Sequence, residues 1–360
     1  MTKDELIKLI KADETITDST LQDLDLSHMD LRGVRFESVA FMDVDFTASQ
    51  IAKTGFRGCS FERVNFNAID FEKLMWQNIS LKNCSFIASD LSKCTFNLID
   101  FSQCDFGEAN LAQATFAQCK LNEVKFSKIS AKKSTFSQCE IKNSLFRECH
   151  LLSTTFFKSE MDGTKFLKTD LVKVVLMECA LVEQDFQNAT LNMVQFNGSD
   201  LSRSNFDTAD LTQSNFYRCN LEYCSLRDVK ANNTIFMEAK LKSADFTRAN
   251  LYQSNFESAA LEHTIFENAN IEQGYFVSVL CEETNFQRAN AKYANFSHAT
   301  FDRVYLQNLN LSHALVHQLE LRDTELSRAN CFALRYTDPD LLEAETFQPP
   351  QTIYQGDIHE

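Results

Sequence analysis

An apolar residue recurs at every fifth position along most of this 360-residue chain. The run begins at Leu21 and ends at Tyr336, and it covers 64 consecutive steps with no residue skipped or inserted. An amphipathic helix would place apolar residues at steps of three and four, and a half-buried strand would alternate with a period of two. A period of five fits neither pattern, so the chain must turn at regular intervals. Repetition on this scale predicts a solenoid.

A second class of residue accompanies these fifth-position residues, which we call centres. Within residues 199–221, the position two before each centre carries a small residue, as Ser204 does before Phe206. Ten of the 12 cysteines lie at this small position, and the other two, Cys281 and Cys331, are centres. Metal ligands or disulfides are the alternative, but no CxxC spacing occurs. We therefore interpret the cysteines as small buried hydrophobes, and reduced thiols fit a cytosolic compartment.

The repeat resembles the pentapeptide-repeat family, whose pattern is Ala-(Asp/Asn)-Leu-x-x. Good matches occur at residues 109–111, 209–211 and 249–251. The resemblance covers about residues 19–338 and implies an all-β solenoid, a right-handed quadrilateral β-helix with four pentapeptides per coil. On that geometry the chain forms about 16 uninterrupted coils with short helical caps. Residues 20 apart then stack in one column on the surface.

The centres themselves fall into two classes. Phe occupies 24 of the 32 centres numbered 26, 36, 46 and onward, and the remaining 32 centres are mostly Leu. Four faces per coil place these classes on alternate faces. We therefore predict two opposite walls of stacked Phe and two walls of Leu or Ile, in which each buried aromatic contributes about 1.5–3 kcal/mol.

The segment before the repeat, residues 1–18, predicts an N-terminal capping helix. Thr2 and Glu5 have the spacing of a capping box, and apolar residues follow at helical spacing, so we expect a helix at about residues 3–12 that covers the first coil. Solenoids need such caps because an end coil exposes core and unpaired backbone. The segment is too short and too charged for a signal peptide or a membrane span.

The segment after the repeat, residues 339–360, predicts a short helix and an extended tail. Asp338 and Pro339 form an N-cap followed by Pro at the first helical position. We expect a helix at about residues 339–345 that closes the last coil. The tail, with its Pro349-Pro350 pair, is a candidate tether for a partner.

A stripe of apolar residues marks the outer surface near the middle of the chain. On a solvated rod these positions should be polar, and exposed apolar patches usually mark interfaces. The stripe therefore predicts a binding site for another protein, with a covered patch or a homodimer seam as the alternatives. Its residues are Leu152, Phe157, Val172, Val175, Met177, Tyr217, Ile235, Met237, Tyr275 and Val277.

A column of lysines runs beside it. An acidic partner or nucleic acid could bind there, but lysines on a β surface are more often solvated and discourage sheet aggregation. The net charge of −15 leads us to expect no direct nucleic-acid binding. The column contains Lys53, Lys73, Lys93, Lys133 and Lys173.

The sequence contains no recognisable catalytic set. The seven histidines share no 20-residue column and have no metal-site spacing. No Gly-rich phosphate loop and no GxSxG motif occurs. We therefore predict a non-enzymatic protein without metal or cofactor.

These features predict a rigid protein-binding scaffold or adaptor in the bacterial cytoplasm, with no membrane association. The Met-Thr-Lys-Asp-Glu-Leu start and the coil at residues 135–140 resemble bacterial pentapeptide proteins linked to type VI secretion. That resemblance implies a role in loading a secretion spike or an effector. Two alternatives remain open. One is a DNA-mimicking modulator of topoisomerases such as gyrase, although the lysine column and the absence of inserted loops depart from that pattern. The other is a secreted, host-directed effector.

Overall fold

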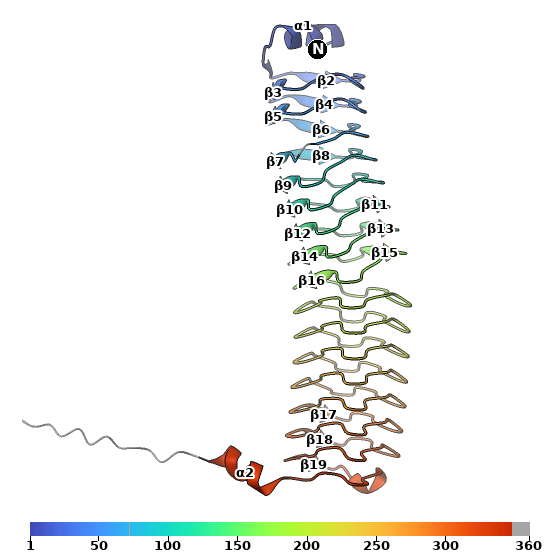
Figure 1. Ribbon diagram of the computed structural model, residues 1–360. Helices are drawn as coiled ribbons and strands as arrows, with labels where there is room; N and C mark the ends of the chain where they lie inside the picture. Colours follow the sequence, from blue (N-terminus) through green and yellow to red (C-terminus); the bar gives the residue numbers. More distant parts are fainter. Residues whose placement is uncertain (72, 348–360) are drawn as a thin grey trace, which may run out of the picture.

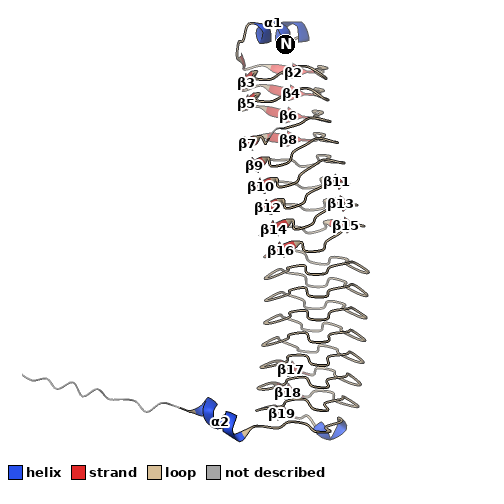
Figure 2. Cartoon of the chain, in the orientation of Figure 1, coloured by secondary structure: helices blue, strands red, loops and turns tan. Residues whose placement is uncertain are grey.

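The computed structural model describes residues 1–71 and 73–347 and is a parallel β-solenoid of about 15 turns (Figure 1). Each pair of hydrogen-bonded strands joins residues 20 apart, as in Phe116↔Phe136. The isolated bridges follow the same step, as in Asn250↔Asn270. Five residues per side make four faces from a 20-residue coil, which confirms the predicted quadrilateral β-helix. Among the described residues, helices lie only at the two ends of the rod (Figure 2).

We name the four faces by the centres of one coil. Face A holds Leu176, face B holds Leu181, face C holds Phe186 and face D holds Leu191. The strands of face A are β1 (Ile16–Thr17), β3 (Arg35–Glu37), β5 (Gly55–Arg57), β7 (Met75–Gln77), β9 (Thr95–Asn97), β10 (Thr115–Ala117), β12 (Thr135–Ser137), β14 (Thr155–Phe157) and β16 (Val175–Met177). Those of face B are β2 (Thr20–Gln22), β4 (Ala40–Met42), β6 (Ser60–Glu62), β8 (Ser80–Lys82), β17 (Leu280–Glu282), β18 (Thr300–Asp302) and β19 (Glu320–Arg322). Those of face C are β11 (Lys125–Ser127), β13 (Leu145–Arg147) and β15 (Lys165–Leu167).

The corners of each coil are residues in the left-handed region of backbone conformation, two positions after a centre. Here φ is +61° at Gln213, +58° at Arg218 and +61° at Tyr223. The left-handed conformation costs an L-residue roughly 1–2 kcal/mol. Hydrogen bonds to the next coil hold each of these corners, as Gln213 N donates to Asn232 O at 3.0 Å. Corner side chains are exposed, so they form the edges of the rod.

The core is a narrow column of stacked rings and aliphatic side chains. Phe116 and Phe136 on face A stack with ring centroids 4.7 Å apart, and Phe126 and Phe146 on face C stack at 4.5 Å. Rings of the two walls meet edge to face, as Phe146 does with Phe156 at 5.8 Å and 89°. This arrangement confirms the predicted opposite walls of Phe and adds an edge-to-face contact that aromatic rings favour.

The small residues two before each centre are inward and mostly buried. Where they carry a hydroxyl, it usually donates to a backbone carbonyl: Ser214 Oγ donates to Leu191 O at 2.6 Å and Thr234 Oγ1 donates to Leu211 O at 2.8 Å. Ser49 Oγ is an exception and has no partner among the described residues. Eleven of the 12 cysteines are buried and free, with only Cys331 partly exposed. The interpretation of the cysteines as buried hydrophobes is confirmed.

The N-terminal end is covered by helix α1 (Lys3–Lys11). The predicted capping box is present: Glu5 N donates to Thr2 Oγ1, and Thr2 N donates to the Glu5 carboxylate. Leu6 of this helix is fully buried against the first coil. The prediction of a capping helix is therefore confirmed.

The C-terminal end differs from the prediction. Helix α2 (Pro339–Thr346) is present with Asp338 as its N-cap, but it buries no residue. The last centres remain open, with Leu321 42% exposed and Tyr336 64% exposed. The expectation that this helix closes the last coil is wrong, because its apolar residues do not face the coil. This open end, which also contains the 3-10 helix η1 (Leu326–Arg328), accounts for a rod of about 15 turns where 64 centres predict about 16 coils. The predicted tail at 348–360 lies outside the described residues.

The hydrogen-bonded ladder opens at two places within the described part of the rod. On face A, β5 and β7 belong to different sheets, and a second opening lies between residues 163–171 and residues 182–190. We call this second opening the split. The bridges expected from Lys165 to Asp185 and from Asp170 to Thr190 are absent from the described bridges, although those on either side are present. No residue is inserted here, so the repeat itself did not predict the opening.

Candidate protein-binding surface

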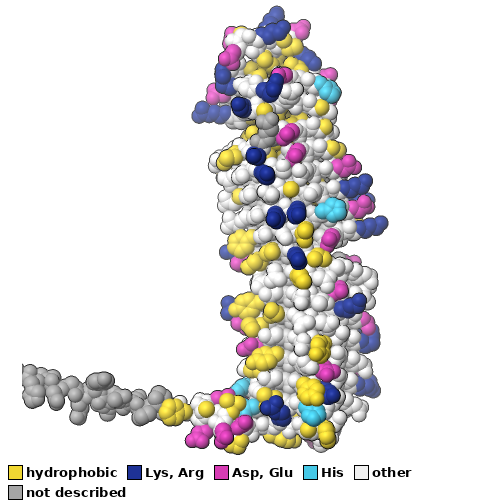
Figure 3. Space-filling view, viewed as in Figure 1, with side chains coloured by type: hydrophobic (Ala, Val, Ile, Leu, Met, Phe, Trp, Pro, Cys, Tyr) yellow, Lys and Arg dark blue, Asp and Glu magenta, His cyan; other side chains and the backbone are white. Residues whose placement is uncertain are grey.

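The predicted apolar stripe lies on face A and on the corner between faces D and A. Leu152, Ile235 and Tyr275 are 40%, 36% and 40% exposed, and the other seven stripe residues are partly buried. Figure 3 shows hydrophobic side chains gathered along the side of the rod that carries β14 and β16. The structure thus places all ten residues on one side, as the 20-residue column predicts.

The stripe is not continuous along the rod. Gln195 and Asn197 occupy its two main columns in one coil, and Asn255 and Glu257 occupy them in another. These polar coils divide the stripe into three patches. The patch around Met177 is the one nearest to the middle of the rod, and it includes the corner residues Leu152 and Val172. A partner that binds along the whole stripe must therefore contact three apolar patches that are separated by polar residues.

Charged side chains border the aromatic residues of the stripe. The Lys158 ammonium lies 5.1 Å from the Phe157 ring centroid, and the Arg218 guanidinium lies 4.8 Å from that of Tyr217. Such cation–π contacts contribute about 0.5–1 kcal/mol at exposed sites. They keep the rings oriented on the surface, so the edge of the patch is preorganised before a partner arrives.

Tyr217 has a second anchor. Its hydroxyl donates to Glu238 Oε1 at 3.2 Å, and Arg218 Nε donates to Glu238 Oε2 at 2.7 Å. The hydrogen bond from Arg218 holds the pKa of the Glu238 carboxyl below its usual range. The carboxylate therefore stays ionised and keeps both neighbours in place at neutral pH.

The predicted lysine column lies on the corner between faces D and A, beside the stripe. Each of its five residues is an exposed corner residue, with φ between +60° at Lys53 and +63° at Lys73. None forms an ion pair with another described residue, whereas Lys82, Lys142 and Lys242 elsewhere on the rod do. The column is therefore an unneutralised positive ridge at the border of the apolar stripe.

Sequence reasoning missed two strongly exposed apolar residues. Met75 is 79% exposed and lies in the same column as Val175, and Leu280 is 62% exposed on face B. The column rule would have found Met75, because it is five coils before Val175. Leu280 lies on a different face, and its neighbours in the column are Ala260 and Thr300.

Sequence reasoning also missed a histidine cluster at the C-terminal end. Donor atoms of His298, His317 and Glu345 lie within 4.8 Å of one another. The histidines are 19 residues apart and Glu345 comes from α2, so no column of the repeat joins them. His317 is fully buried, and its Nδ1 accepts a hydrogen bond from Asp338 N at 3.1 Å.

The chemistry of this cluster favours a latch over a metal site. Because His317 Nδ1 accepts, its Nε2 carries the proton and donates to Glu345 Oε2 at 3.1 Å. A protonated Nε2 cannot ligate a metal ion. Gln318 Nε2 also donates to Glu345 Oε2, at 2.6 Å. The cluster thus attaches α2 to the last coils through polar contacts.

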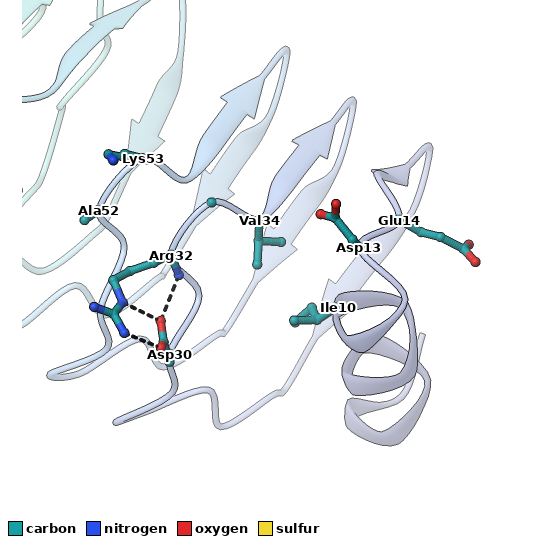
Figure 4. Close-up of a pocket in the computed structure, with 9 residues that line it drawn as sticks. Ile10, Asp13, Glu14, Asp30, Arg32, Val34, Ala52 and Lys53 are labelled. Carbon is teal, nitrogen blue, oxygen red and sulfur yellow. Dashed lines mark hydrogen bonds and ion pairs between the residues drawn. The ribbon is translucent and has the colours of Figure 1, made fainter.

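A cleft of about 710 Å³ lies between α1 and the first coils (Figure 4). Its most prominent polar pair is Arg32 and Asp30, joined from Nε to Oδ1 at 2.9 Å and from Nη2 to Oδ2 at 2.7 Å. The hydrogen bonds from Arg32 lower the pKa of Asp30 to about 2. Arg32 and Asp30 thus neutralise each other at the wall of the cleft.

The fold defines the class of the molecule, a parallel β-solenoid. The chain belongs to the pentapeptide repeat family: the family model described as pentapeptide repeat region matches residues 69–156, 129–206 and 199–276, and that of pentapeptide repeats matches residues 280–318. No curated protein sequence matches the chain.

The chain is also similar to proteins of solved structure. QnrB1, a plasmid-mediated fluoroquinolone resistance protein, is 18% identical over 52% of this chain and 91% of its own, with a TM-score of 0.37. HetL, a pentapeptide repeat protein involved in heterocyst differentiation regulation from the cyanobacterium Nostoc sp. strain PCC 7120, is 15% identical over 86% of this chain and 96% of its own, with a TM-score of 0.22. None of the helices in the described part of the chain is long and apolar enough to cross a membrane.

Proposed function

We propose that the protein is a non-enzymatic, rigid scaffold that binds another protein through the apolar stripe, with the lysine column at its border. The observation that carries this proposal is the stripe itself, ten apolar residues on one side of a rod whose other outward positions are largely polar. Obligate and specific interfaces combine such an apolar centre with a charged rim. The unpaired lysines would select a partner with acidic residues next to its apolar contact and would speed its association.

Within this class we propose an adaptor of the bacterial cytoplasm that loads a type VI secretion spike or effector. The supporting observation is the sequence resemblance of its first residues and of the coil at 135–140 to proteins linked to that system. A rigid rod with three separated apolar patches suits a carrier that must hold one partner in a defined orientation. The tail after residue 347 is a further candidate contact.

A gyrase-directed DNA mimic is less favoured by the charge pattern. Mimicry requires a run of unpaired negative charge that replaces the phosphate backbone. Glu262 is paired with Lys242 at 2.7 Å, and Arg303 contacts both Glu282 and Asp302. Glu262 is thus paired and Glu282 and Asp302 share one arginine, while the unpaired charges beside the stripe are positive.

The test is co-purification with spike and effector proteins of the native host, by wild type and by a Phe157→Glu, Met177→Glu variant. Both changes lie on partly exposed positions, so the rod should fold. Leu280→Glu is the matched control, because it places the same charge at an exposed apolar residue on face B. We expect wild type and the control to retain a spike or effector that the double variant loses. Retention by all three would refute the stripe as the site.

A supercoiling assay and sedimentation separate the alternatives. Inhibition or protection of gyrase at micromolar protein would favour the DNA mimic. A wild-type dimer that becomes a monomer in the double variant, with no other protein bound, would identify the stripe as a homodimer seam.

A further inference from the structure

The split opens the backbone ladder on faces C and D only. In a regular coil the N–H of a face C centre donates to the next coil, as Phe186 N does to Asn205 O at 2.7 Å. The equivalent bond from Phe166 to Asp185 is absent from the described hydrogen bonds. The return bond from Asp185 N to residue 164 is absent as well, so both sides of the split present unpaired backbone groups.

The same two coils remain joined on the opposite side. On face A, Leu176 N donates to Gln195 O at 2.7 Å, and at the next corner Glu178 N donates to Asn197 O at 2.9 Å. The coils therefore diverge toward face C, where Figure 1 shows the coil that carries β15 standing apart from the next coil. The opening is therefore closed on face A, and its two strand edges face each other on faces C and D.

Core residues are accessible inside the split. The rings of Phe166 and Phe186 are 6.4 Å apart, whereas the rings of Phe146 and Phe166, and of Phe186 and Phe206, are 5.1 Å apart. Phe166 is partly exposed, although the equivalent Phe146 is fully buried. Two clefts of about 560 and 370 Å³ lie here, within the range of about 300–1,000 Å³ that is usual for ligand sites.

One side chain inside the split is buried and unpaired. Gln184 occupies an inward position where regular coils carry a small residue, such as Thr164 in the coil before and Ser204 in the coil after. It is only 6% exposed and lines the smaller cleft, but its amide makes no hydrogen bond with any described residue. The Gln184 amide therefore offers two donors and an acceptor to an occupant of the cleft.

We propose that the split is a docking slot for an extended segment of a protein partner, which adds one strand between β15 and residues 184–186. Strand addition of this kind takes its affinity from main-chain hydrogen bonds and its specificity from alternate side chains. The segment would pair with both unpaired edges at once, because each edge faces the other across the opening.

The slot also selects side chains. The contact surface of Phe166 and Phe186 accepts a large apolar residue, and the space beside Gln184 accepts a small one two positions earlier. That order is the order of this chain's own repeat, in which Ser204 precedes Phe206. Charge does not restrict the segment to one sign, because Lys165 lies on one edge and Asp185 on the other.

The split opens on faces C and D, whereas most of the stripe lies on face A, and Val172 is the stripe residue that also lines the larger cleft. The two proposals can therefore fail separately. A Phe157→Glu change alters the stripe and leaves the slot intact.

Hydrogen–deuterium exchange of the full chain tests the slot directly. In the free protein we expect residues 163–171 and 182–190 to exchange at least roughly tenfold faster than the equivalent residues 143–151 and 202–210. The probe is a synthetic peptide with the sequence of residues 202–212, the half-coil that a regular solenoid would place here. It should slow exchange of both edges by a similar factor and bind saturably. The same peptide with Asp in place of its Phe should do neither.

Gln184→Ser is the matched variant, since it restores the small inward residue of regular coils. We expect it to close the split, to slow exchange in the free protein to the rate of neighbouring coils, and to abolish peptide binding. Slow exchange of both edges in free wild type would overturn the proposal. So would the absence of any protection by the peptide at roughly 1 mM.

Other occupants would have distinct signatures. Protection of the edges that appears only as the protein concentration rises would identify a second copy of the chain. Protection present in dilute wild type but lost in an Ile353→Asp, Tyr354→Asp variant would identify the chain's own C-terminal residues. Either result would replace the partner segment as the occupant.

Discussion

The terminal coil at each end of the rod exposes core side chains, and the two ends differ in how a helix covers them. At the N-terminal end, α1 is set by a capping box and buries Leu6 completely. At the C-terminal end, α2 has an equally good N-cap in Asp338 but buries no side chain, and it is held by polar contacts to His317. The comparison shows that a capped helix is not sufficient to cap a solenoid. What matters is whether its apolar residues face the open core.

The largest expected difference between the open end and the interior of the rod is in the alkylation rate of their cysteine thiols. Burial raises the pKa of Cys224 to about 12, whereas Cys331 is partly exposed at the open coil. Only the thiolate reacts, so a thiol with a pKa three units above its ordinary value has roughly a thousandfold less reactive form at neutral pH. We expect one equivalent of rapid alkylation at Cys331, identified by mass spectrometry, and 12 equivalents after unfolding.

Equal labelling of Cys224 and Cys331 in the folded protein would contradict this picture. A Cys331→Ser variant is the control, and it should abolish the rapid phase without changing the slow one.

Removing the apolar anchor of the N-terminal cap should have the next largest effect. Leu6→Ala deletes a fully buried side chain, and such changes cost about 2–5 kcal/mol. The matched change at the other end, Leu341→Ala on α2, removes an exposed side chain and should cost within about 0.5 kcal/mol. Urea unfolding followed by circular dichroism measures both. Similar urea midpoints for the two variants would show that α1 and α2 contribute equally to stability, and this would contradict the difference between the two ends.

The capping box should contribute less than the buried anchor. Thr2→Ala removes the acceptor for Glu5 N, and the loss of an N-cap side chain costs about 1 kcal/mol. Thermal unfolding of Thr2→Ala beside Thr2→Ser tests the point, because serine retains the acceptor. If both variants are destabilised equally, the effect comes from the methyl group and not from the cap.

The sequence determined the core position by position because each position of the repeat obeys one chemical rule. The stacking of Phe116 on Phe136 follows from a 20-residue coil alone. The split could not be predicted from the centres, because Phe166 and Phe186 are both apolar residues at the expected fifth positions. Its one signal is Gln184 at a small inward position, and that signal is visible only when the inward position is checked as strictly as the centre.

The 20-residue columns predicted which outward residues lie on the same side of the rod. The columns brought the stripe residues to one side, but they could not show which rings would be held by neighbouring cations, because that depends on corner side chains such as Arg218. The histidine latch was missed for a related reason. Glu345 belongs to α2, outside the repeat, so no periodic rule relates it to His317.

The latch gives the smallest and most local of the expected effects, a pH dependence of the attachment of α2. The hydrogen bond from His317, with contributions from His298 and Gln318, holds the pKa of Glu345 below its ordinary value of 4.5. A carboxyl whose folded-state pKa is lowered stabilises the folded contact above its ordinary pKa, and the contribution is lost as the pH falls through the lower, folded-state value. Amide resonances of α2 should therefore be constant from neutral pH down to the ordinary carboxyl pKa of 4.5, and should shift toward those of a detached helix only at lower pH. Glu345→Gln should detach α2 at every pH and remove the transition, whereas Glu343→Gln on the same helix should leave it unchanged. If the resonances of α2 in the wild type do not respond to acid, the contact between Glu345 and His317 does not hold this helix. In that case the last coil is less covered than the contacts of His317 indicate.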